Sequence, residues 1–242
     1  MTLPAGRRDL FGRGEGFFLG QLASVPDHAF GEPCRLPRWR RSDLLAHVAR
    51  NADALGNLLT WARTGVETPM YTSAQQRADD IAASAEQAPP ALRADVESAS
   101  ARLVAAVDAL PPEAWDAPVR TARGRAVTAA EVPWMRIRET WVHAVDLGVG
   151  ASFADLRAPV VDDLLDEVAT GLAGRADCPP ATLVEAGGAR SWRIGPAGDG
   201  PGGTTVTGPP HELLAWLIGR AGGDRLTATT SDGRPPAVPA WL

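Results

Sequence analysis

Several residue types and sequence patterns are rare or absent in this sequence, and some of these absences exclude whole classes of protein. It has no lysine, one tyrosine and two cysteines, and its net charge is −5. A negative charge argues against nucleic-acid binding. No apolar run approaches the roughly 20 residues that a membrane-spanning helix needs, and no signal-peptide run follows the N-terminus. No surface signature of oligomerisation is visible, so we expect a cytoplasmic monomer without nucleic-acid or membrane partners.

The cysteines exclude two further classes of protein. Cys34 and Cys178 lie far apart and form neither a disulfide framework nor a zinc-binding spacing. Neither residue sits in a nucleophile motif, so we interpret both as structural.

Periodic apolar residues predict a helical N-terminal domain over residues 1–150. Helices are expected over residues 7–26, 42–64, 90–109 and 128–147, because apolar residues recur there at spacings of three and four. Ser42 is the expected N-cap of the second helix. Ser73 is expected to cap an intervening segment, in which Arg77 would normally be a solvated helix residue. Helices joined by long connections indicate a four-helix bundle.

Residues 151–242 show a different pattern. A helix over 157–173 is followed by short strand-like runs, a second helix from about residue 211 and a last strand, in the order α-β-β-β-α-β. The glycine-rich run 195–203 lacks the ending and the setting of a phosphate loop. We therefore expect an α+β protein, in which a helical bundle precedes a small C-terminal domain.

The last helix of the bundle carries more charge than a buried helix tolerates without partners. Glu139 and His143 are four residues apart, so they lie on one face and could grip one metal ion. Asp146 can reach the same face. The alternative is an ion-paired amphipathic helix with one core histidine. Spacing puts Arg136 and Arg138 off this face, so we interpret them as surface or domain-contact residues.

The start of this helix contains conflicting signals. Thr128 and Glu131 form a capping-box pattern, but Pro133 falls just past the residues whose N–H groups lack partners. Either the helix begins later or its first turn is irregular.

A third ligand could come from the second helix. His47 lies beside its apolar stripe, and Asn51 follows one turn later. Alone, His47 is more often a core histidine than a ligand, and Asn51 is a surface group or a polar group behind the ligands. Together with Glu139 and His143, His47 would make a three-ligand site with an open position, which is typical of catalytic zinc.

The chain resembles the mycothiol-dependent maleylpyruvate isomerases, which belong to the DinB-like superfamily of metal-binding helix bundles. The resemblance is carried by the segments 45–52, 67–71, 134–136 and 138–147. The resemblance extends to residues 219–220 and 239–242. It implies that His47, Glu139 and His143 hold a divalent metal, most simply Zn²⁺.

The resemblance also implies roles for other residues. Arg77 and Arg220 match pocket arginines of the family, and we assign them to substrate binding and enolate stabilisation. We place Asn51, Tyr71 and Asp146 with the thiol cofactor, mycothiol. Asp146 could accept an N–H from a ligand histidine, or it could pair with an arginine at the helix end.

The implied function is the cis-trans isomerisation of maleylpyruvate to fumarylpyruvate in gentisate-type aromatic breakdown. An external thiolate adds to the conjugated double bond, the new single bond rotates, and elimination gives the trans product. One alternative is a mycothiol S-transferase that acts on another electrophile. Another is a non-catalytic protein that senses metal or thiol.

Overall fold

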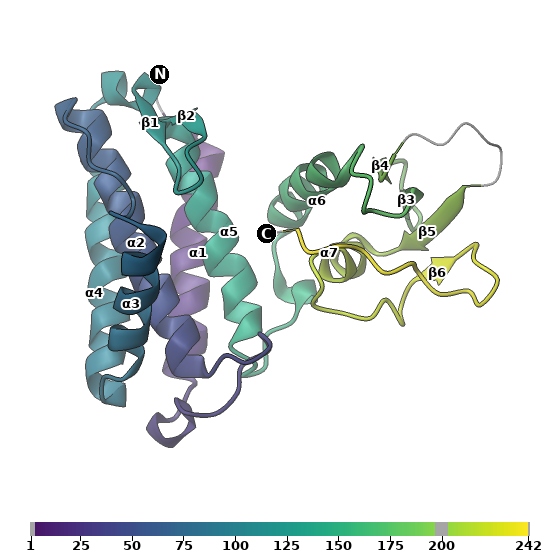
Figure 1. Cartoon of the computed structure of the whole chain (residues 1–242), viewed down its shortest axis with the longest axis horizontal. Coiled ribbons are helices and arrows are strands. Elements are labelled where there is room, and N and C mark those ends of the chain that lie inside the picture. Colours follow the sequence, from purple (N-terminus) through teal and green to yellow (C-terminus); the bar gives the residue numbers. More distant parts are fainter. Residues whose placement is uncertain (1–2, 197–202, 242) are drawn as a thin grey trace. The chain divides into compact units, whose positions relative to one another are not determined.

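The computed structural model describes residues 3–196 and 203–241, and these fall into two compact units. The first unit is Met1–Ala151 and the second is Ser152–Leu242 (Figure 1). Residues 197–202 of the glycine-rich run, and Leu242 of the closing motif, lie outside the described residues.

The first unit is a helical bundle in which α2 packs mainly on α4, and α1 on α5. Leucine, valine, phenylalanine and alanine side chains fill the space between these helices. A short helix, α3, covers part of α2 and begins at the Ser73 cap, whose hydroxyl accepts the N–H of Gln76 at 3.0 Å. The helices are α1 (Ala5–Ala23), α2 (Arg41–Thr64), α3 (Ala74–Ala85), α4 (Pro89–Asp108) and α5 (Val132–Asp146). A small hairpin, β1 (Pro118–Arg120) with β2 (Ala126–Thr128), precedes α5.

The expected N-cap of α2 was wrong by two residues. The helix begins at Arg41, and Ser42 is buried inside its first turn. Arg40 is the cap, and its backbone N–H donates to the Asp43 carboxylate at 2.8 Å. A bridge between Pro33 and Arg40 closes the preceding loop, so the chain turns into the helix before Ser42 is reached.

The start of α5 resolves the conflict around Pro133. Residues Ala129–Glu131 form a 3-10 turn, and the α-helix begins at Val132. Thr128 makes no side-chain capping bond, so the predicted capping box was wrong. Pro133 is the second residue of the α-helix, where its missing N–H would have had no intrahelical partner.

Helices α1 and α5 approach closely because α1 has a glycine at the contact. A Cβ atom on Gly14 would lie 2.5 Å from Thr140 Oγ1 and 2.7 Å from Trp141 Nε1. The Trp141 indole N–H donates to the Leu10 carbonyl at 3.2 Å. The missing side chain therefore allows the two backbones to meet, which brings Glu15 to the face of α5.

The second unit combines two helices with a mixed sheet, and the whole chain has the expected α+β class. The described strands pair in the order β4-β3-β5-β6, with β3 and β5 parallel and the outer pairs antiparallel. Buried Leu183 pairs with Val206 in the central register. The elements are α6 (Ala158–Leu172), β3 (Ala181–Glu185), β4 (Ser191–Ile194), β5 (Thr204–Gly208), α7 (Pro210–Leu217) and β6 (Thr227–Ala228).

No helix in the described part of the chain is both long enough and apolar enough to cross a membrane.

Candidate metal centre

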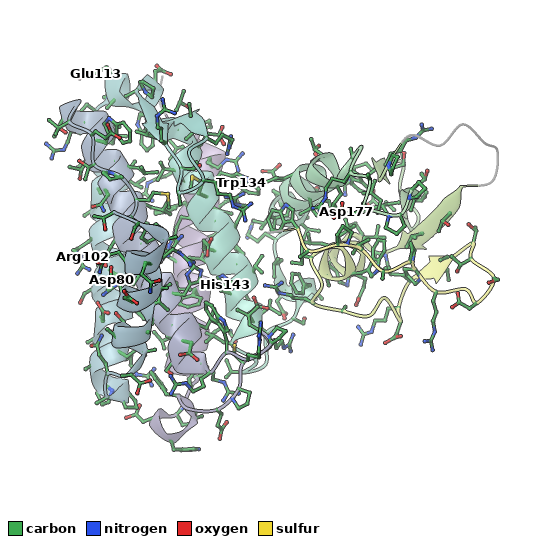
Figure 2. The ribbon with its side chains drawn as sticks, viewed as in Figure 1. Asp80, Arg102, Glu113, Trp134, His143 and Asp177 are labelled. Atoms are coloured by element: carbon green, nitrogen blue, oxygen red, sulfur yellow. The ribbon has the colours of Figure 1, made fainter. Side chains whose placement is uncertain are left out.

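Three side chains from two helices converge in the bundle. His47 on α2 and Glu139 and His143 on α5 each offer a ligand atom, and these atoms all lie within 4.8 Å of one another. Glu139 Oε2 is 2.9 Å from His47 Nε2 and 3.2 Å from His143 Nε2. Figure 2 labels His143 on α5. The pair predicted from i,i+4 spacing and the histidine predicted on a facing helix therefore share one site.

The other nitrogen of each imidazole also has a partner. His143 Nδ1 lies 2.9 Å from Asp146 Oδ2, and Asp146 is fully buried. His47 Nδ1 lies 3.3 Å from Nη2 of Arg77, which α3 contributes. These contacts fix both rings so that their Nε2 atoms face Glu139.

The electrostatics of the cluster set different protonation states for the two histidines. Burial lowers the pKa of His47, against the opposing effect of Glu139. Burial also disfavours the cation of His143, but hydrogen bonds to Asp146 and Glu139 outweigh it and raise the pKa to about 9. The same imidazoles hold the pKa of Glu139 well below its usual range despite its burial. At neutral pH we assign a neutral His47, a cationic His143 and an ionised Glu139.

The contacts of His47 then determine its tautomer in the metal-free protein. A guanidinium can only donate, so Nδ1 of His47 accepts from Arg77. Its proton therefore sits on Nε2, which donates to Glu139.

Two aromatic side chains flank the cluster. The Arg77 guanidinium lies 5.6 Å from the centre of the Tyr71 ring, and burial raises the pKa of Tyr71. Trp39, in the loop before α2, sits edge-on to His47 with 5.7 Å between ring centres. Trp39 was not among the residues predicted for the site. The only available signal was an aromatic residue shortly before a candidate ligand.

The interpretation of Arg136 as a surface or domain-contact residue was wrong. Arg136 is 0% exposed, and it pairs with Glu15 of α1 at 2.6 Å. Asn51 is likewise buried rather than on the helix surface, and its Oδ1 accepts from Arg136 at 3.1 Å. Contact of Asn51 with a thiol cofactor stays a prediction. Arg138 is half-buried on α5.

The remaining candidate residues do not contribute to the three-ligand cluster. Arg220 belongs to the second unit, where its Nη1 donates to the Ile218 carbonyl at 2.9 Å. Its convergence with Arg77 stays a prediction. Cys34 is half-buried and Cys178 is buried, and both are free thiols. His28 is exposed in a short 3-10 turn.

The donor set fits a divalent metal ion. Two imidazole nitrogens and one carboxylate form a set used by zinc and related ions, and three protein ligands leave a position for a further ligand. The side chains of Glu139 and His143 keep 21% and 13% of their surface exposed, so a small molecule can reach them. Fold and site together define a helix-bundle protein with a candidate divalent metal centre.

Comparison with known proteins specifies the family. Residues 11–148 match the family domain described as "Mycothiol maleylpyruvate isomerase N-terminal domain", and residues 155–240 match the "MDMPI C-terminal domain". The chain belongs to the mycothiol maleylpyruvate isomerase family. No curated protein matches the sequence.

Two solved structures are similar along the whole chain. One is a crystal structure of the mycothiol-dependent maleylpyruvate isomerase, with 37% sequence identity, a TM-score of 0.92 and 100% coverage of both chains. The other is a histidine-to-alanine mutant described by the same name, with 36% identity and the same TM-score and coverage.

Proposed function

We propose that the protein catalyses the mycothiol-dependent cis-trans isomerisation of maleylpyruvate to fumarylpyruvate. Its family and the name of its structural neighbours support this activity. The observation that carries the proposal is the convergence of His47, Glu139 and His143 beside Arg77. We place the reaction in the cytoplasm, in a monomeric enzyme.

The ligand cluster is proposed to hold Zn²⁺ through the Nε2 atoms of both histidines and a carboxylate oxygen of Glu139. A bound zinc ion would lower the pKa of a thiol at its open position, so that the thiolate exists near neutral pH. Neither cysteine of the chain is suited to replace that external thiol, because burial raises the pKa values of both Cys34 and Cys178.

The chain's own residues then orient and stabilise the reactants. Asp146 accepts a hydrogen bond from the Nδ1–H group of His143 and so keeps the Nε2 lone pair of this ring directed at the site. Arg77 lies beside the cluster and can bind a carboxylate of the dianionic substrate. We assign Arg220 to the second anionic group and to the enolate that forms when the thiolate adds. Tyr71 holds Arg77 by a cation-π contact.

The direct test is conversion of maleylpyruvate by the purified, zinc-loaded protein. Fumarylpyruvate formation is followed with and without mycothiol. Conversion is expected only with both thiol and metal, and His47→Ala is expected to abolish it. His28→Ala is the matched control, because His28 is exposed in a short 3-10 turn and is not one of the three candidate ligands. Conversion that survives His47→Ala would contradict the role of the metal cluster.

Two other outcomes would replace the proposal with another function. Thioether formation with other electrophiles, without conversion of maleylpyruvate, would identify a mycothiol S-transferase. Binding of metal and thiol without any turnover would identify a sensor.

A further inference from the structure

A buried arginine connects four helices of the bundle. Arg136 on α5 uses all five of its N–H groups. Nε donates to Glu15 Oε1 at 2.6 Å and Nη2 to Glu15 Oε2 at 3.2 Å. Nη1 donates to the Val48 carbonyl at 2.8 Å and to Asn51 Oδ1 at 3.1 Å, and Nη2 donates to Ser100 Oγ at 3.3 Å. Ser100 in turn donates to Glu15.

This network lies one helical turn from the candidate metal ligands. Arg136 precedes Glu139 by three residues and His143 by seven, so the three lie on one stripe of α5. On α2, Asn51 follows His47 by four residues. His47 faces Glu139 and Asn51 faces Arg136, so the two helices run antiparallel through both contacts. One turn corresponds to about 5 Å along each axis.

The metal cluster depends on the register between α2 and α5, because its ligands come from both helices. A slip of one residue would move His47 by about 1.5 Å and rotate it by about 100°. Metal–ligand distances tolerate only about 0.2 Å. Apolar packing also opposes such a slip, and the planar guanidinium adds donors in fixed directions to two groups of α2.

We propose that Arg136, held by Glu15, is a positioning residue that sets the register of α2 against α5 and thereby assembles the metal ligands. Its side chain donates to Glu15, Val48, Asn51 and Ser100 rather than to a ligand atom. The alternative is a buried ion pair that only fills the core, since such pairs are often replaceable by apolar side chains without loss of stability. The inference rests on the metal site of the proposed function.

The test uses Co²⁺ as a probe of the metal-free, full-length protein. Co²⁺ affinity is measured by competition with a chelator, and the visible absorption band reports the ligand geometry. The Glu15→Met/Arg136→Met variant removes both charges together, so that neither is left buried alone. Arg136→Lys keeps the ion pair but lacks the fork that reaches α2. Leu58→Ala is the matched control, because it removes core volume from α2 about 16 Å beyond His47.

Each variant is first shown to be folded by circular dichroism and urea unfolding. The two Arg136 variants are expected to bind Co²⁺ about tenfold or more weakly and to change the band. Leu58→Ala is expected to lose stability but to keep the affinity and the band of the parent. If the double variant does not fold, the Co²⁺ affinity of Arg136→Lys alone tests the positioning role. This variant is expected to fold, because it retains the buried charge pair.

The outcomes separate this inference from the proposed function. Parent-like affinity and absorption in a folded Arg136 variant would overturn the positioning role, provided that His47→Ala abolishes binding. If the parent binds no Co²⁺, or His47→Ala binds it equally well, the metal site itself fails and the register inference falls with it.

Discussion

The stability of the metal-free protein should fall as the pH rises from 7 to 9. The cause is His143, whose hydrogen bonds to Asp146 and Glu139 exist in full only while the ring is a cation. Burial opposes this cation, but the two carboxylates raise its pKa from the ordinary 6.5 to about 9. The chain studied must be free of metal, since an ion would displace the Nε2 proton.

The sign and size of the effect follow from linkage. The folded-state pKa of His143 lies above the unfolded value, so its contribution is complete below pH 6.5 and is lost as the pH passes 9. A pKa raised from 6.5 to about 9 corresponds to about 3 kcal/mol, of which about 2 kcal/mol disappears between pH 7 and pH 9. Glu139 stays ionised throughout this range, because its pKa is lowered.

Urea unfolding at several pH values, in the presence of a chelator, measures this loss. Starting at pH 7 avoids His47, whose lowered pKa affects stability only under more acidic conditions. In Asp146→Asn the decline should flatten, because the largest contribution that raises the pKa of His143 is removed. In Asp155→Asn, a carboxylate of the second unit, the slope should match the parent. A parent whose stability is constant from pH 7 to pH 9 would refute the reasoning.

Three further predictions concern the metal and the helix contacts. Affinity for Zn²⁺ should rise about tenfold between pH 7 and pH 8, and less steeply towards pH 9, because the ion competes with the His143 proton, whose pKa is about 9. Near pH 7, calorimetry in several buffers should detect about one proton released. Gly14→Ala should lower the free energy of unfolding by about 1–3 kcal/mol, because its Cβ atom would collide with Thr140. In the control Gly16→Ala, at an exposed glycine where a Cβ would have no atom within 4 Å, the free energy of unfolding should stay the same or rise. Equal effects of the two substitutions would contradict the close approach of α1 and α5. Co²⁺ binding should quench tryptophan fluorescence less in Trp39→Phe than in the parent, because the ring centres of Trp39 and the ligand His47 lie 5.7 Å apart. Undiminished quenching in Trp39→Phe would place the ion elsewhere.

The local half of the candidate site could be predicted from the sequence. Glu139 and His143 are four residues apart, and helical geometry alone puts them on one face. His47 needed a resemblance to a known family, because nothing local indicates which helix faces which. Trp39 was missed for the same reason, since its contact with His47 depends on how a loop closes before α2.

Arg136 shows why the remainder could not be predicted. The spacing of residues on α5 shows which of them share a face, but a helix inside a bundle is covered on several sides. Its partner Glu15 is 121 residues away, and the two meet only because Gly14 lets α1 approach α5. The same limitation affected the cap of α2, where the closed loop before the helix, rather than the side-chain preference of Ser42, sets the first residue.

The contact between Arg77 and His47 implies an order of assembly. A metal ion on Nε2 of His47 requires the ring proton to move to Nδ1, where the Arg77 guanidinium now donates. Two donors cannot share this contact, so the Arg77 N–H must release His47 when the ion arrives. One N–H group of Arg77 is therefore engaged by His47 before the metal binds and becomes available to an anion afterwards. Loading of the metal should thus precede capture of the substrate, and an enzyme stripped of its ion should bind the dianion weakly as well as fail to activate the thiol.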